Sequence, residues 1–492
     1  MILAQYTIRT KQEYIFRTNR INEIVGASAL ISEIWGDLFR IATEIGLDVS
    51  RATESSGFDF DMHKNMNSKF ISELFCGGGN LTVLYDSRTT YLELNKRFSY
   101  FVLSERAGMV PMAVCTNVTG DYCKDYKSLL VEAEKEKNRM NPARDCFILP
   151  FSKMDRNTFL PIAGEQYDFS VQREISYESA IKAKRGIELR DDSVKMIDDM
   201  VSKRGQESLL AVVHADGNNM GRKISRLLEA DTDYSRCVKK MRRFTFDTAK
   251  AFTETGENAM AECKRELMKN NTKLKDNSFA YRVIVADGDD FTFICNARFA
   301  MEYTKAYLKA VCSYNGSEWK YSSCAGICIF HSHYPFDRAY SLAEQACDDG
   351  AKKMVHGRDD GSVEEGWVDF HYIHSGIGGN LSVIRKMQKT DEHMARPWLV
   401  TGETGSFRNY DNLDTIYGIL KDYKITRTLL KEIGQAWESS KAAGRYSLER
   451  IISGKDELKN KLLSIMGNTD NLLSAIYDLS EVIDLWYEEV PV

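Results

Sequence analysis

Two short acidic segments limit the possible folds of this chain more than any other feature of its sequence. HADGNNMG, at residues 214–221, follows an apolar run that starts at Ser208, and VADGDDF, at 285–291, follows a similar run that starts at Tyr281. The first pattern predicts a strand, a turn and the start of a helix. The second predicts a hairpin, because the apolar run resumes directly after Asp290.

The acidic side chains of the two segments are predicted to meet at one edge of a sheet. Asp216 ends the first strand, and Asp289 and Asp290 lie on the hairpin turn. In a βαββαβ unit these strand ends are neighbours, and three carboxylates repel one another unless a divalent cation binds them. We therefore predict that Asp216, Asp289 and Asp290 are catalytic and hold Mg²⁺ or Mn²⁺. The backbone carbonyl of Gly217 is a further candidate ligand.

This layout is typical of a nucleotidyltransferase palm, in which two metal ions activate a hydroxyl and stabilise a leaving pyrophosphate. A simpler interpretation stays open, because Asp-Gly pairs are common in hairpin turns that bind no metal. Asn218 and Asn219 either contact the ribose or phosphate of a nucleotide or cap the helix that begins near Met220. A helix N-terminus at this point would itself suit a triphosphate.

The predicted order of elements, βαββαβ, occurs twice. In the first copy the expected elements are the strand Ile2–Ile8, the helix Asn19–Ile45, the strands Phe70–Phe75 and Leu81–Tyr85, the helix Tyr91–Ser104 and the strand Val110–Thr116. In the second copy they are the strand Leu209–Ala215, a helical region from Met220 to about Lys269, the strands Ala280–Ala286 and Phe291–Cys295, the helix Phe299–Ser313, the strand Tyr321–Phe330 and the helix Phe336–Met354. The turn Gly77–Asn80, GGGN, takes the place of the DGDD turn in the first copy. This parallel indicates a duplication in which only the second copy keeps its carboxylates.

We therefore predict an α+β chain with two ferredoxin-like (βαββαβ) palm domains and helical regions between and after them. The expected domains are the first palm at 1–118, a helical or irregular connecting domain at 119–204, the second, catalytic palm at 205–375 and a helical C-terminal domain at 376–492. An apolar stripe from Leu472 to Trp486 has helical spacing. It is predicted to be helix-bundle core, with packing on the active palm or on another chain as the alternative.

The composition is that of an ordinary globular protein. Of the 492 residues 28% are charged, and 66 basic against 71 acidic residues give a formal net charge of −5. This balance argues against nucleic-acid binding by charge alone, and a basic cluster at 236–243 is interpreted as a solvated helix face. No apolar run approaches the length of a membrane span, and the 11 cysteines form no CxxC pair. We therefore expect a cytoplasmic protein with reduced thiols and no membrane association.

Several segments, taken together and in this order, resemble a known family. The opening YTIRTKQEYIFRTNRINEIVGASALIS, the turn GGGN, the segment HADGNNMG, the turn DGDD and the closing YSSCAGICIFHSHYPFDRAYSLAEQACDDGAKKM are similar to parts of the large, polymerase-like subunit of type III CRISPR effector complexes and its stand-alone relatives. Those proteins share a palm domain with the GGDEF diguanylate cyclases. The sequence departs from the family in three respects: it has no adjacent His-Asp pair, no zinc-binding cysteine pairs, and Asp287 in place of the first glycine of GGDD.

The resemblance implies a Mg²⁺-dependent nucleotidyltransferase that makes cyclic or short linear oligonucleotides from ATP in antiviral defence. It also implies that Lys352 or Lys353 approaches the β- and γ-phosphates, and that the first palm holds a second nucleotide without catalysing. The nucleotide-contacting residues of the two turns would be Gly77, Gly78, Gly79, Asn80 and Gly288. Two other functions stay open: an RNA-binding large subunit that grips guide and target RNA beside other CRISPR subunits, and a nucleotide sensor without turnover. A homo-oligomer is a further possibility.

Overall fold

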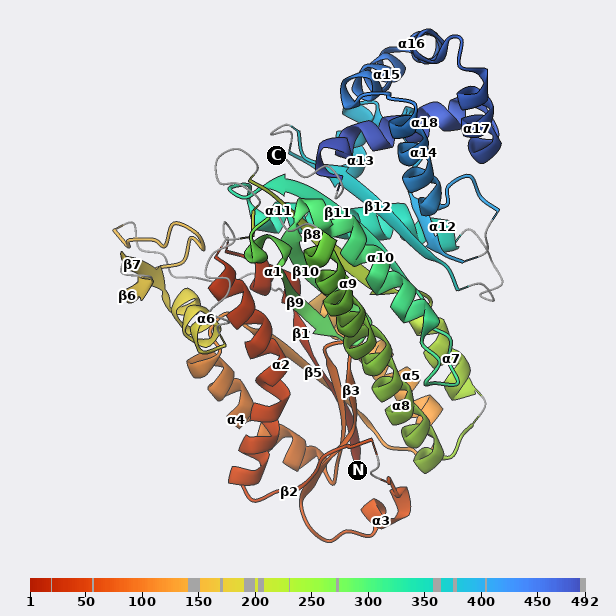
Figure 1. Ribbon diagram of the computed structural model, residues 1–492. Coiled ribbons are helices and arrows are strands. Elements are labelled where there is room, and N and C mark those ends of the chain that lie inside the picture. The colour runs from red at the N-terminus through yellow and green to blue at the C-terminus, as the bar shows by residue number, and fades with distance from the viewer. Residues whose placement is uncertain are drawn as a thin grey trace. The chain divides into compact units, whose positions relative to one another are not determined.

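The computed structural model, shown in Figure 1, describes residues 1–18, 20–54, 57–139, 151–168, 171–189, 200–201, 208–229, 231–270, 274–356, 364–374, 378–402 and 405–486. The chain forms two compact units, each built from several stretches of sequence. The first comprises Met1–Met196, Asn219–Thr253 and Ile284–Asp289, and the second comprises Ile197–Asn218, Glu254–Val283 and Asp290–Val492. The domain boundaries expected at 204/205 and 375/376 fall on residues outside the described ranges and stay predictions.

A five-stranded sheet forms the core of the first unit. Its strands are β1 (Ile2–Arg9), β2 (Asp48–Ser50), β3 (Phe70–Gly77), β4 (Asn80–Tyr85) and β5 (Val110–Asn117), in the order β2-β3-β4-β1-β5. The part β3-β4-β1-β5 is an antiparallel ferredoxin-like arrangement, so the first βαββαβ unit is confirmed. The short strand β2, parallel to β3, extends this sheet and has no counterpart among the predicted elements.

Two long helices, α2 (Ile21–Glu44) and α4 (Arg88–Glu105), make the crossovers of this unit, and the short helices α1 (Lys11–Phe16) and α3 (Phe60–Lys64) flank them in the chain. The apolar residues of α2 recur at helical spacing, and Ile24, Ile34 and Leu38 are all buried. The predicted helix spanning 19–45 is therefore confirmed over Ile21–Glu44.

The stretch expected to be helical or irregular between 119 and 204 contains both helices and strands. Its elements are α5 (Tyr122–Arg139), β6 (Ile162–Asp168), β7 (Val171–Ser176) and α6 (Tyr177–Glu188), and β6 pairs with β7 as an antiparallel hairpin. Helix α6 packs closely on α2. A Cβ added at Gly26 would lie 1.8 Å from the carbonyl oxygen of Lys182, and one added at Gly186 would lie 1.8 Å from that of Asn22. Only glycine permits this approach of two backbones.

The two helices that follow HADGNNMG, α7 (Met220–Glu229) and α8 (Tyr234–Ala249), belong to the first unit. Helix α8 lies on β3 through Arg242, which is 5% exposed. Its guanidinium donates to the carbonyl oxygens of Leu74 at 2.7 Å and Glu73 at 2.5 Å. The interpretation of the basic cluster as a solvated face is thus wrong for Arg242, whose burial is offset by backbone acceptors.

The second unit is built on a six-stranded sheet. The strands of the sheet are β8 (Leu209–Gly217), β9 (Tyr281–Asp287), β10 (Asp290–Asn296), β11 (Ser323–His331), β12 (Gly366–Tyr372) and β13 (Trp398–Thr401), in the order β13-β12-β11-β8-β10-β9. The end of β9, from Ile284 onward, is assigned to the first unit. The part β11-β8-β10-β9 repeats the ferredoxin-like order, so the second βαββαβ unit and the α+β class are confirmed. Strand β13 is an exception to the helical character expected after about residue 376, because it pairs antiparallel with β12.

The helices of this unit before the C-terminal region are α9 (Gly256–Asn270), α10 (Ala300–Ser313), α11 (Phe336–Gln345) and α12 (Lys352–His356). A π-helical turn, Ala346–Ala351, separates α11 from α12, so the predicted single helix 336–354 is three pieces. This turn lies close to β11, because a Cβ added at Gly326 would come within 2.4 Å of the Cys347 amide nitrogen. Single π-turns within helices occur frequently at functional sites.

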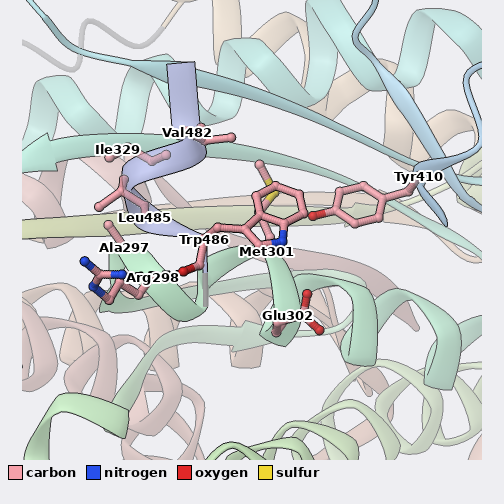
Figure 2. A pocket seen from close by; sticks show the side chains of 9 residues that line it. All are labelled: Ala297, Arg298, Met301, Glu302, Ile329, Tyr410, Val482, Leu485 and Trp486. Atoms are coloured by element: carbon pink, nitrogen blue, oxygen red, sulfur yellow. Dashed lines mark hydrogen bonds between the residues drawn. The ribbon is translucent and has the colours of Figure 1, made fainter. Parts of the chain in front are cut away.

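The α-helices described in the C-terminal region are α13 (Leu381–Met387), α14 (Tyr410–Asp422), α15 (Arg427–Ser439), α16 (Lys441–Ile452), α17 (Asp456–Met466) and α18 (Thr469–Val482). The apolar stripe of α18 is buried, which confirms its interpretation as core. Just after α18, Leu485 and Trp486 line a small cavity together with Ile329 of β11 and Met301 of α10. Figure 2 shows the indole of Trp486 beside Met301 and Tyr410. The stripe thus continues into packing on the palm of its own unit.

Within the described residues, none of the helices combines the length and the apolar character that crossing a membrane requires.

Candidate functional site

Asp216 and Asp290 are direct partners in the antiparallel pair of β8 and β10. Side chains of paired residues lie on the same face of a sheet with Cβ atoms about 4.5–5.5 Å apart. Both residues are partly exposed, with 28% of the Asp216 side chain and 21% of the Asp290 side chain accessible. The structure therefore brings together two of the three carboxylates that the sequence predicts to be catalytic.

The backbone around Asp216 holds its carboxylate in place. The amide of Gly217 donates to Oδ1 of Asp216 at 2.9 Å, and the hydroxyl of Ser323, on β11, donates to the Asp216 backbone oxygen at 3.0 Å. The other carboxylate oxygen, Oδ2, accepts a hydrogen bond from Nζ of Lys352. Asp216 thus has a fixed orientation and a cationic partner.

Lys352 reaches Asp216 from the first residue of α12, directly after the π-helical turn. It also lies 3.5 Å from Asp348, and its side chain is 15% exposed. Burial opposes its charge, but Asp216 and the other anionic groups nearby outweigh that effect and raise the pKa of Lys352. Lys353 differs: its side chain is 65% exposed and pairs with Asp349 at 3.1 Å. Of the two predicted lysines, the structure places Lys352 at the carboxylate.

His214 is a site residue that the sequence argument missed. Its ring is buried, lies 3.5 Å from Oδ1 of Asp290, shares a 3.2 Å hydrogen bond with Thr292 and contacts Tyr340 edge-on. Burial lowers the pKa of His214. A signal was available, because alternate residues of a strand share a face, so that His214 and Asp216 on β8 lie opposite Thr292 and Asp290 on β10.

Asn218 differs from the expectation that it contacts a nucleotide or caps a helix. It is 2% exposed, and its amide nitrogen donates to the Ser322 hydroxyl at 2.9 Å and the Glu365 carbonyl at 2.8 Å. Its side chain therefore fixes the end of β8 to the side chain of Ser322 and the backbone of Glu365 in the same unit. Asn219 has a left-handed φ of 57° and its carbonyl accepts from Lys223, so its backbone starts α7. A nucleotide contact by Asn219 stays a prediction.

The first sheet contains the same register without the carboxylates. In β1 and β4, Thr7 is the partner of Asn80, as Asp216 is the partner of Asp290 in β8 and β10. Asn80 begins β4 directly after the glycine turn, and its amide donates to the Gly78 carbonyl at 3.0 Å. Two neutral side chains thus occupy the positions of two acids, which supports the prediction that the first palm does not catalyse.

The GGGN turn and part of the DGDD turn lie in the first unit and touch each other. Gly78, Gly79 and Gly288 all have positive φ, at 59°, 71° and 67°. A Cβ added at Gly288 would lie 2.8 Å from the amide nitrogen of Gly78. Asp287, which precedes Gly288, forms an ion pair of 3.3 Å with Lys11. The charge of Asp287 is therefore balanced by a lysine of the same unit.

A divalent cation fits the chemistry of the site in part. Oxygen ligands from carboxylates are those that Mg²⁺ prefers, and Asp216 and Asp290 supply two. Among the residues that the structure describes, no group of three or more His, Cys, Asp or Glu side chains is arranged to hold a metal ion. Asp289 directly precedes Asp290 in the chain but is assigned to the first unit. Metal ligation by Asp216, Gly217, Asp289 and Asp290 stays a prediction.

Residues 209–361 match the family model of the second palm domain of Cas10/Cmr2. Comparison with curated protein sequences gives no match. Among solved structures, the chain resembles a Csm1–Csm4 cassette in complex with cA4 (TM-score 0.54, 12% identity, 99% of this chain and 70% of the matched chain). It also resembles that cassette with pppApA (TM-score 0.54, 12% identity, 100% and 69%) and with one ATP (TM-score 0.52, 11% identity, 100% and 70%). The chain therefore has a Cas10-like palm fold, as the motifs indicate.

Proposed function

We propose that this protein is a metal-dependent nucleotidyltransferase that joins ATP into cyclic or short linear oligonucleotides. The observation that carries the proposal is the facing pair Asp216 and Asp290 on a Cas10-type palm domain. Proteins of similar fold have been solved with cA4, pppApA and ATP, which supports ATP as the substrate. Activity in CRISPR-type antiviral defence belongs to the same proposal.

In this proposal Asp216 and Asp290 bind Mg²⁺ or Mn²⁺, with Asp289 and the Gly217 carbonyl as further ligands. The metal would lower the pKa of the attacking 3′-hydroxyl and stabilise negative charge on the leaving pyrophosphate. The backbone amide of Gly217 holds Asp216 in its orientation, and His214 packs behind Asp290. These contacts preorganise the carboxylates before substrate binds.

Lys352 has a second task in the proposal. Its ammonium neutralises Asp216 in the structure, where that carboxylate would otherwise repel the Asp290 carboxylate. When a cation occupies the carboxylates, the ammonium is released toward the phosphates of the substrate. A lysine on a flexible stem suits such an exchange of partners because it acts as a point charge.

The experiment is turnover of each nucleoside triphosphate by purified protein with Mg²⁺ or Mn²⁺, followed by pyrophosphate release and product mass. We expect an oligonucleotide, formed most readily from ATP. Asp290→Asn should lower the rate at least a hundredfold, since such variants remove charge stabilisation of the transition state. Glu93→Gln, which alters an exposed carboxylate of the first unit, is the matched control. Tight ATP binding without turnover under all conditions, including added RNA, would favour the nucleotide sensor instead.

Assembly with a partner subunit is a second proposal, favoured by the comparison with structures of a Csm1–Csm4 cassette. The fold match covers nearly the whole chain. Association with other CRISPR subunits and with guide or target RNA would then control the synthase. Sedimentation of the protein with and without the products of neighbouring genes tests this, and an unchanged monomer in every mixture would contradict it.

A further inference from the structure

We propose that the Lys11–Asp287 ion pair is a latch that joins the glycine turn of the first palm to the DGDD turn and positions the acidic residues that follow it. Both residues are positioning residues and not catalytic ones. The inference rests on the proposed function only for its effect on rate. The existence of the latch does not depend on that function, because it concerns only the contact between the two turns.

The geometry of the latch is defined within the first unit. Nζ of Lys11 lies 3.3 Å from Oδ2 of Asp287, and the two side chains are 23% and 32% exposed. Lys11 begins α1 immediately after Thr10, which has a left-handed φ of 50°. From this position the side chain of Lys11 reaches Asp287, which is 276 positions away in the sequence.

The latch closes over the glycine turn. A Cβ added at Gly79 would lie 2.3 Å from Nζ of Lys11 and 3.0 Å from Oδ2 of Asp287. The ammonium and the carboxylate thus rest directly on a buried glycine with a φ of 71°. On the other side of the contact, Gly288 meets the Gly78 backbone with no room for a side chain. The ion pair and the close approach of Gly288 to Gly78 together fix one turn against the other.

A comparison of equivalent positions in the two palms explains why the ion pair is formed from the DGDD turn and not from the glycine turn. Gly77 ends β3 as Asp287 ends β9, so the two residues are equivalent in the duplicated units. A Cβ at Gly77 would lie 2.7 Å from Cγ2 of Thr245, so a side chain has no space there. Asp287 has that space and uses it for Lys11. This asymmetry places the carboxylate of the ion pair on the catalytic turn.

The anchor precedes the acidic pair by two residues. Asp287 is the last residue of β9, and Asp290 is the first of β10. With Asp287 held, the intervening Gly288 and Asp289 form a short turn between two fixed ends. Without the ion pair, the turn would sample more conformations, and the carboxylates would spend less time in the geometry that binds metal.

The test compares Lys11→Met, Asp287→Asn, their double variant and the charge swap Lys11→Glu with Asp287→Lys. Hydrogen exchange at residues 77–80 and 287–290 reports the latch without any turnover. We expect faster exchange in both turns for each single variant, no further increase in the double variant, and recovery in the swap. Lys69→Met, which removes an exposed lysine paired with Glu93 at 3.2 Å in the same unit, is the matched control and should leave both turns unchanged.

The rate is measured separately on the same proteins. Because the ion pair is partly exposed, we expect a modest effect, roughly a fivefold lower kcat in each single variant, with KM for ATP little changed and kcat restored in the swap. Unchanged exchange in both single variants overturns the latch. Faster exchange with unchanged kcat overturns the positioning role. If the parent protein consumes no nucleotide, the proposed function fails while the exchange result still decides the latch.

Discussion

Lys352 donates a hydrogen bond to Oδ2 of Asp216, so the carboxylate predicted to bind a metal ion already carries a cationic partner. The pair spans 136 positions of sequence and is formed within one unit. If Asp216 binds a divalent cation as proposed, the cation and Lys352 compete for the same oxygen. Metal binding and the role of the lysine can therefore be tested separately by removing the lysine.

Lys352→Met removes the competitor. Without nucleotide, we expect Mn²⁺ to bind more tightly, by roughly five- to tenfold if the ion pair contributes about 1–1.5 kcal/mol. With nucleotide, turnover should fall because the phosphates lose a point charge. Calorimetric titration with Mn²⁺ measures the first effect. Lys309→Met, at an exposed lysine of the same unit, is the control. Weaker Mn²⁺ binding in Lys352→Met would show that the lysine does not compete with the metal.

Gly79→Ala should destabilise the protein for two reasons that can be separated. The φ of 71° at this position costs an alanine about 1 kcal/mol, and the added Cβ would collide with Lys11. Gly120 has a φ of 96° and open space around it, so Gly120→Ala carries the backbone cost alone. We expect urea denaturation to show a larger loss for Gly79→Ala. Equal losses would mean that the contact with Lys11 has no energetic weight.

His371 should make folding stability depend on pH. Burial first, and then the charges of Arg396 and Arg385, lower its pKa from 6.5 to about 3. Between these values the unfolded chain binds the proton and the folded chain does not, so stability falls as pH falls through this window. We expect about 2 kcal/mol of this loss between neutral pH and about pH 5. His371→Gln should show a correspondingly smaller loss in urea denaturation, and an identical pH slope would contradict the assignment.

Trp486→Ala should destabilise the second unit by about 3–5 kcal/mol, the usual cost of removing a buried large aromatic side chain. Trp486 is 6% exposed and lines the cavity formed with Ile329 and Met301. Tyr446→Ala, at a side chain that is 73% exposed, is the control. The same packing predicts that deletion of 405–492 gives an unstable protein. A folded truncated protein with higher basal synthesis would instead support restraint by this segment.

The sequence predicted the parts of the fold that depend on local pattern. The βαββαβ order, together with the turn chemistry of DGDD, was sufficient to predict that the strand end at Asp216 lies next to the turn that holds Asp290, and the structure makes the two residues direct partners. Strand β12 escaped prediction because polar residues interrupt it: Asp369 and His371 are buried there, and Arg385 pairs with Asp369 at 2.8 Å. Buried charged residues interrupt the apolar pattern of a strand, so hydrophobicity alone does not predict such a strand.

The contacts that distinguish this site depend on tertiary structure. The family resemblance directed attention to Lys352 and Lys353 equally, and neither pattern nor spacing separated them. Asn218 resembled a ligand-binding or capping residue, yet its amide is used by Ser322 and Glu365. Lys11 lies in a charged stretch, and its partner, Asp287, is distant in the sequence. Tertiary packing determines which of these side chains contact the site, and sequence periodicity carries no information about those contacts.

The π-helical turn Ala346–Ala351 has a consequence for how this chain tolerates insertions and deletions. A π-turn adds one residue to a helical turn, and each residue rotates an α-helix by about 100°. Loss of one residue from this turn would restore a regular α-helix and leave the residues on either side in place, because the π-turn takes up its extra residue within about one helical turn. We therefore expect a structure of such a deletion to show Lys352 still on Asp216. The turn thus makes the position of the lysine at the carboxylate insensitive to the loss of one residue between α11 and α12.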